Sequence, residues 1–187
     1  FLADPYPTFA RLRAEAPVHD HPLLGMPVAG SHAACSQVLR GRELGRIWRD
    51  AEPAESFRAF NLLHRNSLLE REGPSHARLR SAVAGAFNRG HTARLAPWVG
   101  ALADRLAGEL AAAIDEHGSA DLMSILAAPL PVEVIAELLG VPEPTRSRMR
   151  GWSNAIVAMY EPDPGEARRA AAERAAAEFV NELRAFA

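Results

Sequence analysis

Lysine is absent from this sequence, and all 21 of its basic residues are arginine. Cysteine occurs once, as Cys35, which excludes an internal disulfide framework and a zinc site built from several cysteines. The chain has no apolar run of about 18 residues that would cross a membrane, and no signal peptide opens it. Together these absences predict a protein of the reducing cytoplasm.

Charge of either sign is not in excess. The formal net charge is -2 at pH 7, so the surface as a whole does not attract phosphate backbones or anionic lipids. We therefore expect no nucleic-acid partner and no membrane partner. The alanine-rich final segment carries charges of both signs, which predicts a solvated helix face and not a nucleic-acid-binding arm.

Length and composition suit one globular domain, because the chain has 187 residues, of which 48% are hydrophobic and 24% are charged. Its two ends indicate a fragment. The chain begins at Phe1, and its last segment continues with helical spacing to Ala187 without the glycine or proline that normally closes a helix. We therefore expect residues 1–187 to form one portion of a larger domain.

Helical periodicity covers most of the chain and predicts a mainly α fold of about seven helices with a small β patch. The helix predicted from residue 97 has an apolar face that includes Leu102 and Leu106. A cap-like pair, Ser119 and Asp121, begins a further short segment. The principal predicted helices span residues 4–17, 31–41, 74–87, 97–118 and a buried 131–142, followed by one segment on each side of "EPDPGE".

The β patch lies between residues 18 and 30, where prolines and glycines interrupt the chain around Gly25. This pattern predicts two short strands joined by a turn. From residue 42 to residue 67 no clean period survives, which predicts a long loop with one or two helical turns. A loop of this length inside a compact domain is commonly functional.

The stretch "EGPSHARLR", Glu72 to Arg80, places an imidazole and a guanidinium four residues apart at the start of a predicted helix. Pro74 suits the first helical position, where its missing N–H costs nothing. His76 and Arg80 lie on one helix face near the positive end of the helix dipole. Such a pair suits a carboxylate, which arginine binds through two parallel hydrogen bonds. The alternative, a solvated polar face, is what composition alone favours.

Five stretches stand out along the chain: "DPYPTFARLRAEAPV", "SHAACSQVLRG", "EGPSHARLRSAVAGAFN", "ADLMSILAAPLPVEVIAELLGVP" and "RSRMRGWSNAI". They occur in the order and spacing found in bacterial cytochromes P450, and the chain resembles the N-terminal half of that family. The proline-flanked "PLPVEVIAELLGVP" and the His-x-x-x-Arg of "PSHARLR" are specific when taken together. The resemblance implies that residues 1–187 form the N-terminal portion of a single P450 domain, ending before its central oxygen-activating helix and its cysteine loop.

The resemblance also implies a function. Full-length members are haem-thiolate monooxygenases, which oxidise a small organic substrate with electrons from a redox partner such as a ferredoxin. By motif position, His76 and Arg80 would bind the propionates of haem b. No catalytic residue and no iron ligand is expected in this chain. The sequence departs from the family pattern "DPPEHTRLR" at Glu72, Gly73 and Ser75, whereas the liganding pair is intact.

Two other family motifs are not matched in the right context. Cys35 lacks the Phe-x-x-Gly-x-x-x-Cys-x-Gly surroundings of the family's iron ligand, so we interpret it as a small core residue. Glu-x-x-Arg matches such as Glu43–Arg46, Glu143–Arg146 and Glu166–Arg169 are interpreted as chance occurrences in a chain rich in both residues.

His64 and Leu69 are candidates for a substrate pocket. His64 lies in the long loop before the haem-facing helix, a region that lines the pocket in the resembled family. We expect residues 50–66 and 157–165 to form part of this pocket. Two alternatives stay open, because nearby Phe57, Phe60, Leu62 and Leu63 equally suit core anchors. His64 itself also fits a surface residue, as do the other histidines, none of which shows metal-pair spacing: His19, His21, His32, His91 and His117.

Two rival functions remain. A haem-free P450-like protein that activates a partner enzyme is favoured by the departures at Glu72, Gly73 and Ser75 and opposed by the intact His76 and Arg80. A plain helical interaction module is disfavoured by the spacing of the matched stretches along the chain.

Overall fold

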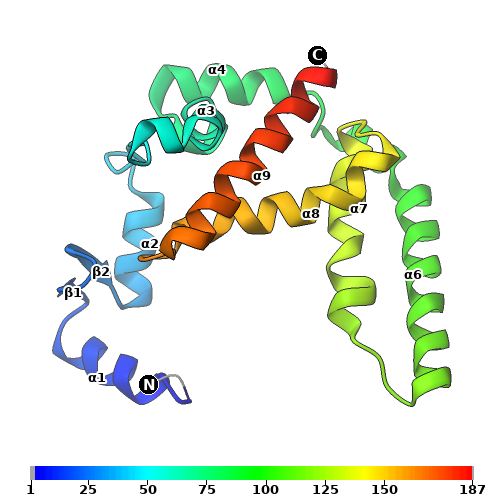
Figure 1. Ribbon diagram of the computed structural model, residues 1–187. Helices are drawn as coiled ribbons and strands as arrows, with labels where there is room; N and C mark the ends of the chain where they lie inside the picture. The colour runs from blue at the N-terminus through cyan, green and yellow to red at the C-terminus, as the bar shows by residue number, and fades with distance from the viewer. Residues whose placement is uncertain (1–2, 187) are drawn as a thin grey trace. The chain divides into compact units, whose positions relative to one another are not determined.

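The computed structural model describes residues 3–186, in which nine α-helices, four shorter helical turns and one two-stranded sheet are found. The chain divides into two compact units, of which the first ends at Ile47 and the second begins at Trp48. Figure 1 shows that the second unit is mostly helical, whereas the first combines two helices with the sheet. The predicted fold class, mainly α with a small β patch, is therefore confirmed.

The first unit contains the whole sheet. Its elements are α1 (Tyr6–Glu15), β1 (Val18–His21), β2 (Met26–Ala29) and α2 (His32–Arg40). The strands pair antiparallel around the predicted turn, in which Gly25 has a φ of 61° that suits glycine. Ser31 caps α2 as expected, since its hydroxyl accepts a hydrogen bond from the backbone N–H of Ala34 at 3.1 Å. Half-buried Cys35 packs here, and its thiol donates to the carbonyl of Ala29 at 3.3 Å.

A small aromatic core holds the second unit together. Phe57 and Phe60 pack against Ala172 and Ala176, all four being buried. The alanines let the neighbouring chain approach closely, because they present almost no side chain. The elements around this core are η1 (Ala54–Ser56), α3 (Arg58–Arg65), η2 (Leu68–Glu70), α8 (Glu143–Val157), η4 (Ala158–Tyr160) and α9 (Gly165–Phe186).

The remaining helices of the second unit follow the predicted pattern with local differences. Leu102 and Leu106 are buried as expected, and Gly118 ends their helix with a φ of 75°. The segment after it is capped by Asp121 and not by Ser119, since the Asp121 carboxylate accepts from the backbone N–H of Met123 at 2.9 Å. These elements are α4 (Gly73–Ala84), α5 (Arg89–Arg94), α6 (Ala96–His117), η3 (Met123–Ala127, a π-helix) and α7 (Pro129–Leu138).

Three predictions about helices need correction. The expected count of about seven is too low, because α3 and α5 are too short to show a clear period. The helix expected at 131–142 begins and ends earlier, at Pro129–Leu138. It was expected to be buried, yet only Ala136 of α7 is fully so, and Ile135 is 42% exposed.

Ion pairs join α7, α8 and α9. The Arg146 guanidinium on α8 donates to Glu137 at 2.8 Å and lies 3.4 Å from Glu133, both on α7. Arg148 bridges from α8 to Glu178 at 3.0 Å and to Glu182 at 2.8 Å on α9. Arg146 therefore pairs with α7 and not with the Glu-x-x-Arg partner suggested by spacing alone.

Candidate functional site

The pair His76 and Arg80 lies on α4, one turn apart and on one face. His76 is half-buried and Arg80 is exposed. Within residues 3–186, neither side chain forms a hydrogen bond or an ion pair. The imidazole of His76 and the guanidinium of Arg80 are thus available to an anionic ligand. Both can donate hydrogen bonds, which fits the two propionate carboxylates of a haem.

The start of α4 explains one departure from the family pattern. Glu72 precedes the helix in an extended conformation, and Gly73 then takes a φ of 58°. This left-handed conformation is open to glycine and closed to proline, whose ring holds φ near about -65°. Gly73 therefore stands where the family has proline because this helix is entered differently. His76 and Arg80 keep their common face all the same.

A cavity of about 370 Å³ opens in the second unit. Both sequence candidates for substrate contact, His64 and Leu69, line it. Its walls come from α3, η2, α8, η4 and α9, and most of the side chains are apolar. The lining residues are Leu63, His64, Ser67, Leu69, Met149, Trp152, Ser153, Ile156, Val157, Tyr160 and Phe179.

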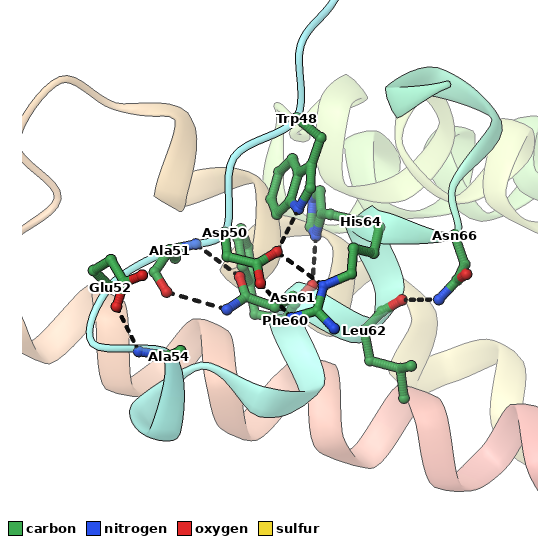
Figure 2. Close-up of polar contacts among 11 residues, drawn as sticks. Trp48, Asp50, Ala51, Glu52, Ala54, Phe60, Asn61, Leu62, His64 and Asn66 are labelled. Carbon is green, nitrogen blue, oxygen red and sulfur yellow. Dashed lines mark hydrogen bonds and ion pairs between the residues drawn. The ribbon is translucent and has the colours of Figure 1, made fainter. Parts of the chain in front are cut away.

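His64 is buried, with only 7% of its surface exposed, so its interpretation as a surface histidine is wrong. Its Nδ1–H donates to the carbonyl oxygen of Phe60 at 2.8 Å. The ring stacks on Phe60 at 4.1 Å and on Trp48 at 4.8 Å between centroids. Tyr160 meets it edge-on at 5.8 Å. The hydrogen bond and these three rings fix the orientation of the imidazole, and Figure 2 shows the hydrogen bond and the position of Trp48.

The aromatic partner Trp48 is itself anchored. Its indole N–H donates to Asp50 Oδ1 at 2.8 Å, and Arg65 Nε donates to the same oxygen at 2.9 Å. Hydrogen bonding by Arg65, and then by Trp48, lowers the pKa of the Asp50 carboxyl below its ordinary value. Asn61 exchanges two hydrogen bonds with the backbone of Ala51, at 2.8 and 3.1 Å. Residues 48–51 are therefore fastened to α3 beside His64.

A carboxylate on α9 caps α3. Phe57 precedes the helix and supplies no capping side chain. Instead, Glu173 accepts hydrogen bonds from the backbone N–H groups of Ala59 at 2.8 Å and Phe60 at 2.9 Å. A negative charge at this end also complements the helix dipole. The helix that carries His64 is thus held against α9 by its own backbone.

One wall of the cavity was missed by the sequence analysis. It is the inner face of α8, where buried Trp152 donates its indole N–H to Glu178 at 2.8 Å. This bond, followed by that from Arg148, lowers the pKa of the Glu178 carboxyl. The signal for this wall was present as helical spacing of i, i+3, i+4 and i+7. The residues concerned are Met149, Trp152, Ser153 and Ile156.

The open alternatives for the other loop residues are resolved by burial. Phe57 and Phe60, each 3% exposed, are core anchors. Leu63 packs against that core and also lines the cavity, whereas Leu62 is 38% exposed. The segments 50–66 and 157–165 both contribute to the cavity. His76 and Arg80 are not among its lining residues.

No group of three or more His, Cys, Asp or Glu side chains within residues 3–186 is arranged to hold a metal ion. The same described residues contain no helix with the length and apolar character that crossing a membrane requires.

Comparison with known proteins gives no matching family model. Among curated proteins, the chain is 42% identical over 182 residues to the cytochrome P450 monooxygenase PikC of Streptomyces venezuelae, covering 92% of this chain and 41% of that protein. It is 31% identical over 159 residues to the vitamin D(3) 25-hydroxylase of Pseudonocardia autotrophica, covering 84% of this chain and 38% of the relative. The chain thus spans about two fifths of the length of these relatives.

Solved structures agree with the sequence matches. P450BioI, in complex with an acyl carrier protein ligated to hexadec-9Z-enoic acid, has a TM-score of 0.81 at 21% identity, which shows a common fold; 95% of this chain and 46% of that chain are covered. The myxobacterial cytochrome P450 CYP267B1, in complex with myristic acid, has a TM-score of 0.74 at 33% identity, with 98% and 46% covered. By sequence and by fold, this chain belongs to the cytochrome P450 superfamily and corresponds to the N-terminal half of its members.

Proposed function

We propose that the protein containing this chain is a haem-thiolate monooxygenase that hydroxylates or otherwise oxidises a small organic substrate. The observation that carries the proposal is the pair His76 and Arg80, which share one face of α4 and have no partner within residues 3–186. Sequence identity of 42% to a cytochrome P450 monooxygenase supports it. One argument for the rival proposal, a haem-free auxiliary protein, was that glycine replaces the family's proline at position 73. The positive φ of Gly73 accounts for this departure, so it no longer supports the rival.

Haem b is the cofactor we propose, with its propionates held by His76 and Arg80. When bound, it supplies the oxidising chemistry of the reaction, with a cysteine outside these residues as its ligand. The two side chains neutralise and orient the propionates, and each charge-assisted hydrogen bond contributes about 1.5–3 kcal/mol net. They take no part in the oxygen chemistry.

The cavity beside His64 is the part of the substrate pocket that we assign to these residues. Its largely apolar walls would bind a hydrophobic substrate and exclude water from it. Bonds from Glu173 to α3 and from Arg148 to Glu178 and Glu182 hold α3, α8 and α9 together outside the cavity lining, and the Trp152–Glu178 bond ties a lining side chain to α9. Leu69, which is 67% exposed, would be partly covered by a bound substrate.

A redox partner such as a ferredoxin is proposed from the charge distribution. Residues 73–103 contain no Asp or Glu, although the chain as a whole has a net charge of -2. An acidic electron-transfer protein would be steered toward such a surface. Arg78 lies about 200° around α4 from His76, so it faces away from the propionate-binding side. The exposed arginines of this stretch are Arg78, Arg80, Arg89 and Arg94. A cytoplasmic location is part of the same proposal, since soluble ferredoxins act there.

The test is a carbon-monoxide difference spectrum of the reduced full-length protein. We expect the absorption band of thiolate-ligated haem. Purified protein that contains no haem after expression with a haem precursor, and that gives no such band, would favour the auxiliary-protein alternative. Substrate oxidation with a ferredoxin and its reductase would then extend the test from cofactor to activity.

A further inference from the structure

We propose that the cavity beside His64 selects an uncharged, largely apolar molecule through one O–H or N–H group that donates a hydrogen bond to His64 Nε2. The proposal deepens the proposed function, on which it rests for the identity of the cavity as a substrate pocket. It adds the chemical class of the ligand and the residue that distinguishes it.

The hydrogen bond to Phe60 fixes which nitrogen of His64 carries the proton. A carbonyl oxygen can only accept, so the contact of 2.8 Å requires a hydrogen on Nδ1. In the uncharged imidazole, Nε2 then carries a lone pair and acts as an acceptor. A ring flip would break this bond, because it would place a carbon where Nδ1 now donates. The acceptor is therefore held in place before any ligand arrives.

His64 is one of the residues that line the cavity, and its Nε2 is the ring nitrogen that the bond to Phe60 leaves over. It has no hydrogen-bond partner within residues 3–186, although the side chain is only 7% exposed. In the same described residues, no fully buried side-chain nitrogen or oxygen lacks a partner. Nε2 is consequently not sealed inside the core, and the space that His64 lines is the cavity.

The other lining groups do not duplicate this acceptor. The indole N–H of Trp152 is engaged by Glu178 at 2.8 Å, and the hydroxyl of Tyr160 lies 3.5 Å from Glu70 Oε1. Ser67 and Ser153 carry hydroxyls that either donate or accept, so they do not discriminate between ligand types. None of the lining residues is an Asp, Glu, Lys or Arg. A charged ligand would therefore lose its hydration on binding without gaining an ion pair in return.

The experiment compares two isomers and one acid by calorimetric titration of the full-length protein. n-Decanol and methyl nonyl ether have the same composition, but only the alcohol has a donor; decanoate adds a negative charge. We expect n-decanol to bind about 2- to 10-fold more tightly than the ether, as one net hydrogen bond predicts. Equal affinity of the two isomers, or tighter binding of decanoate than of n-decanol, overturns the proposal without any variant.

The variant His64→Phe keeps an aromatic ring but removes the acceptor. We expect the affinity ratio of the two isomers to fall to about one, with ether binding changed by less than about twofold. Leu69→Ala is the control, because it shortens an apolar wall and should weaken both isomers equally, leaving their ratio unchanged. A ratio that survives in His64→Phe contradicts the role of Nε2.

Calorimetry detects the isomer preference whether or not haem is bound. A preference for n-decanol in a protein without the carbon-monoxide band would refute the monooxygenase function and leave the acceptor role standing. A normal carbon-monoxide band without a preference for n-decanol would refute the acceptor role of His64 and leave the monooxygenase function standing.

Discussion

The carboxylate of Glu173 accepts a hydrogen bond at 2.9 Å from the backbone N–H of Phe60, a residue 113 positions earlier in the chain. A second bond, from Ala59, completes the cap of α3. This helix also carries His64 and Leu63 into the cavity. The position of the cavity wall thus depends on a side chain outside the cavity lining.

Replacing Glu173 by Ala should destabilise the second unit. Two N–H groups at the start of α3 would lose a charged acceptor, which costs about 1.5–3 kcal/mol. Glu173→Gln retains one acceptor oxygen, so we expect a smaller loss. Urea unfolding followed by circular dichroism measures both effects. Arg174→Ala, at the next and exposed position of α9, is the control, and a loss as large as that of Glu173→Ala would argue against capping.

Acid should weaken the anchor of Trp48. The pKa of the Asp50 carboxyl is lowered below its ordinary value in the folded state by its bonds with Arg65 and Trp48. A carboxyl with a depressed folded pKa contributes stability above its unfolded pKa and loses it as the pH falls through the folded value. We therefore expect wild-type stability to fall more steeply than that of Asp50→Asn below about pH 4.

Thermal unfolding midpoints across the acid range measure this difference, together with the fluorescence of Trp48. The variant Asp163→Asn changes an exposed carboxyl in the turn before α9 and serves as the control. Its profile should follow that of the wild type. Parallel acid profiles for Asp50→Asn and wild type would show that the Asp50 carboxylate adds nothing to the folded state.

Replacing glycine by alanine should change the free energy of unfolding in opposite directions at two positions of the α4 region, Gly73 and Gly85. Gly73 has a φ of 58° with no atom within 4 Å of an added Cβ, so Gly73→Ala tests the backbone conformation alone. We expect it to destabilise by about 1–2 kcal/mol. Gly85, with a φ of -62° and equal free space, is the matched control. Gly85→Ala should stabilise by about 0.4–1 kcal/mol, because it restricts the unfolded chain. Equal denaturation midpoints for the two variants would contradict the left-handed start of α4.

Sequence periodicity located the long helices because their apolar spacing is repeated over several turns. Leu102 and Leu106 were assigned to the buried face of α6, and Gly118 to its end, as the structure has them. The six residues of α5 span fewer than two turns, too few for a period to be visible. The predicted burial of α7 is too high. Apolar residues between prolines indicate a helix with an apolar surface, but they do not show how much of that surface other helices cover.

The candidate site was accessible to sequence reasoning only in part. His64 and Leu69 were proposed for a pocket and line one cavity, yet no pattern in the sequence places Trp48 on the imidazole or Glu173 at the start of α3. Such contacts join residues far apart in the chain, and periodicity describes only residues that are near in sequence. The α8 wall is different, since the spacing from Met149 to Ile156 marked a helix face that was not assigned to the pocket.

Haem retention provides the sharpest test of His76 and Arg80. Arg80→Ala removes the guanidinium, and the loss of its charge-assisted bonds should weaken haem binding about 10- to 100-fold. The helix itself should persist, because Arg80 is exposed and makes no hydrogen bond or ion pair within residues 3–186. The haem-to-protein ratio after purification, and the rate of haem transfer to an acceptor apoprotein, measure the effect.

Arg78→Ala is the matched control for this measurement. Arg78 lies on the opposite side of α4 from His76 and Arg80, since residues two positions apart on a helix differ by about 200°. It carries the same charge and is likewise exposed, so any general electrostatic effect of losing an arginine would appear in both variants. Haem loss confined to Arg80→Ala, and increased when His76→Ala is added, would separate direct binding from surface charge. Equal haem content in Arg80→Ala and Arg78→Ala would mean that neither side of α4 holds the propionates.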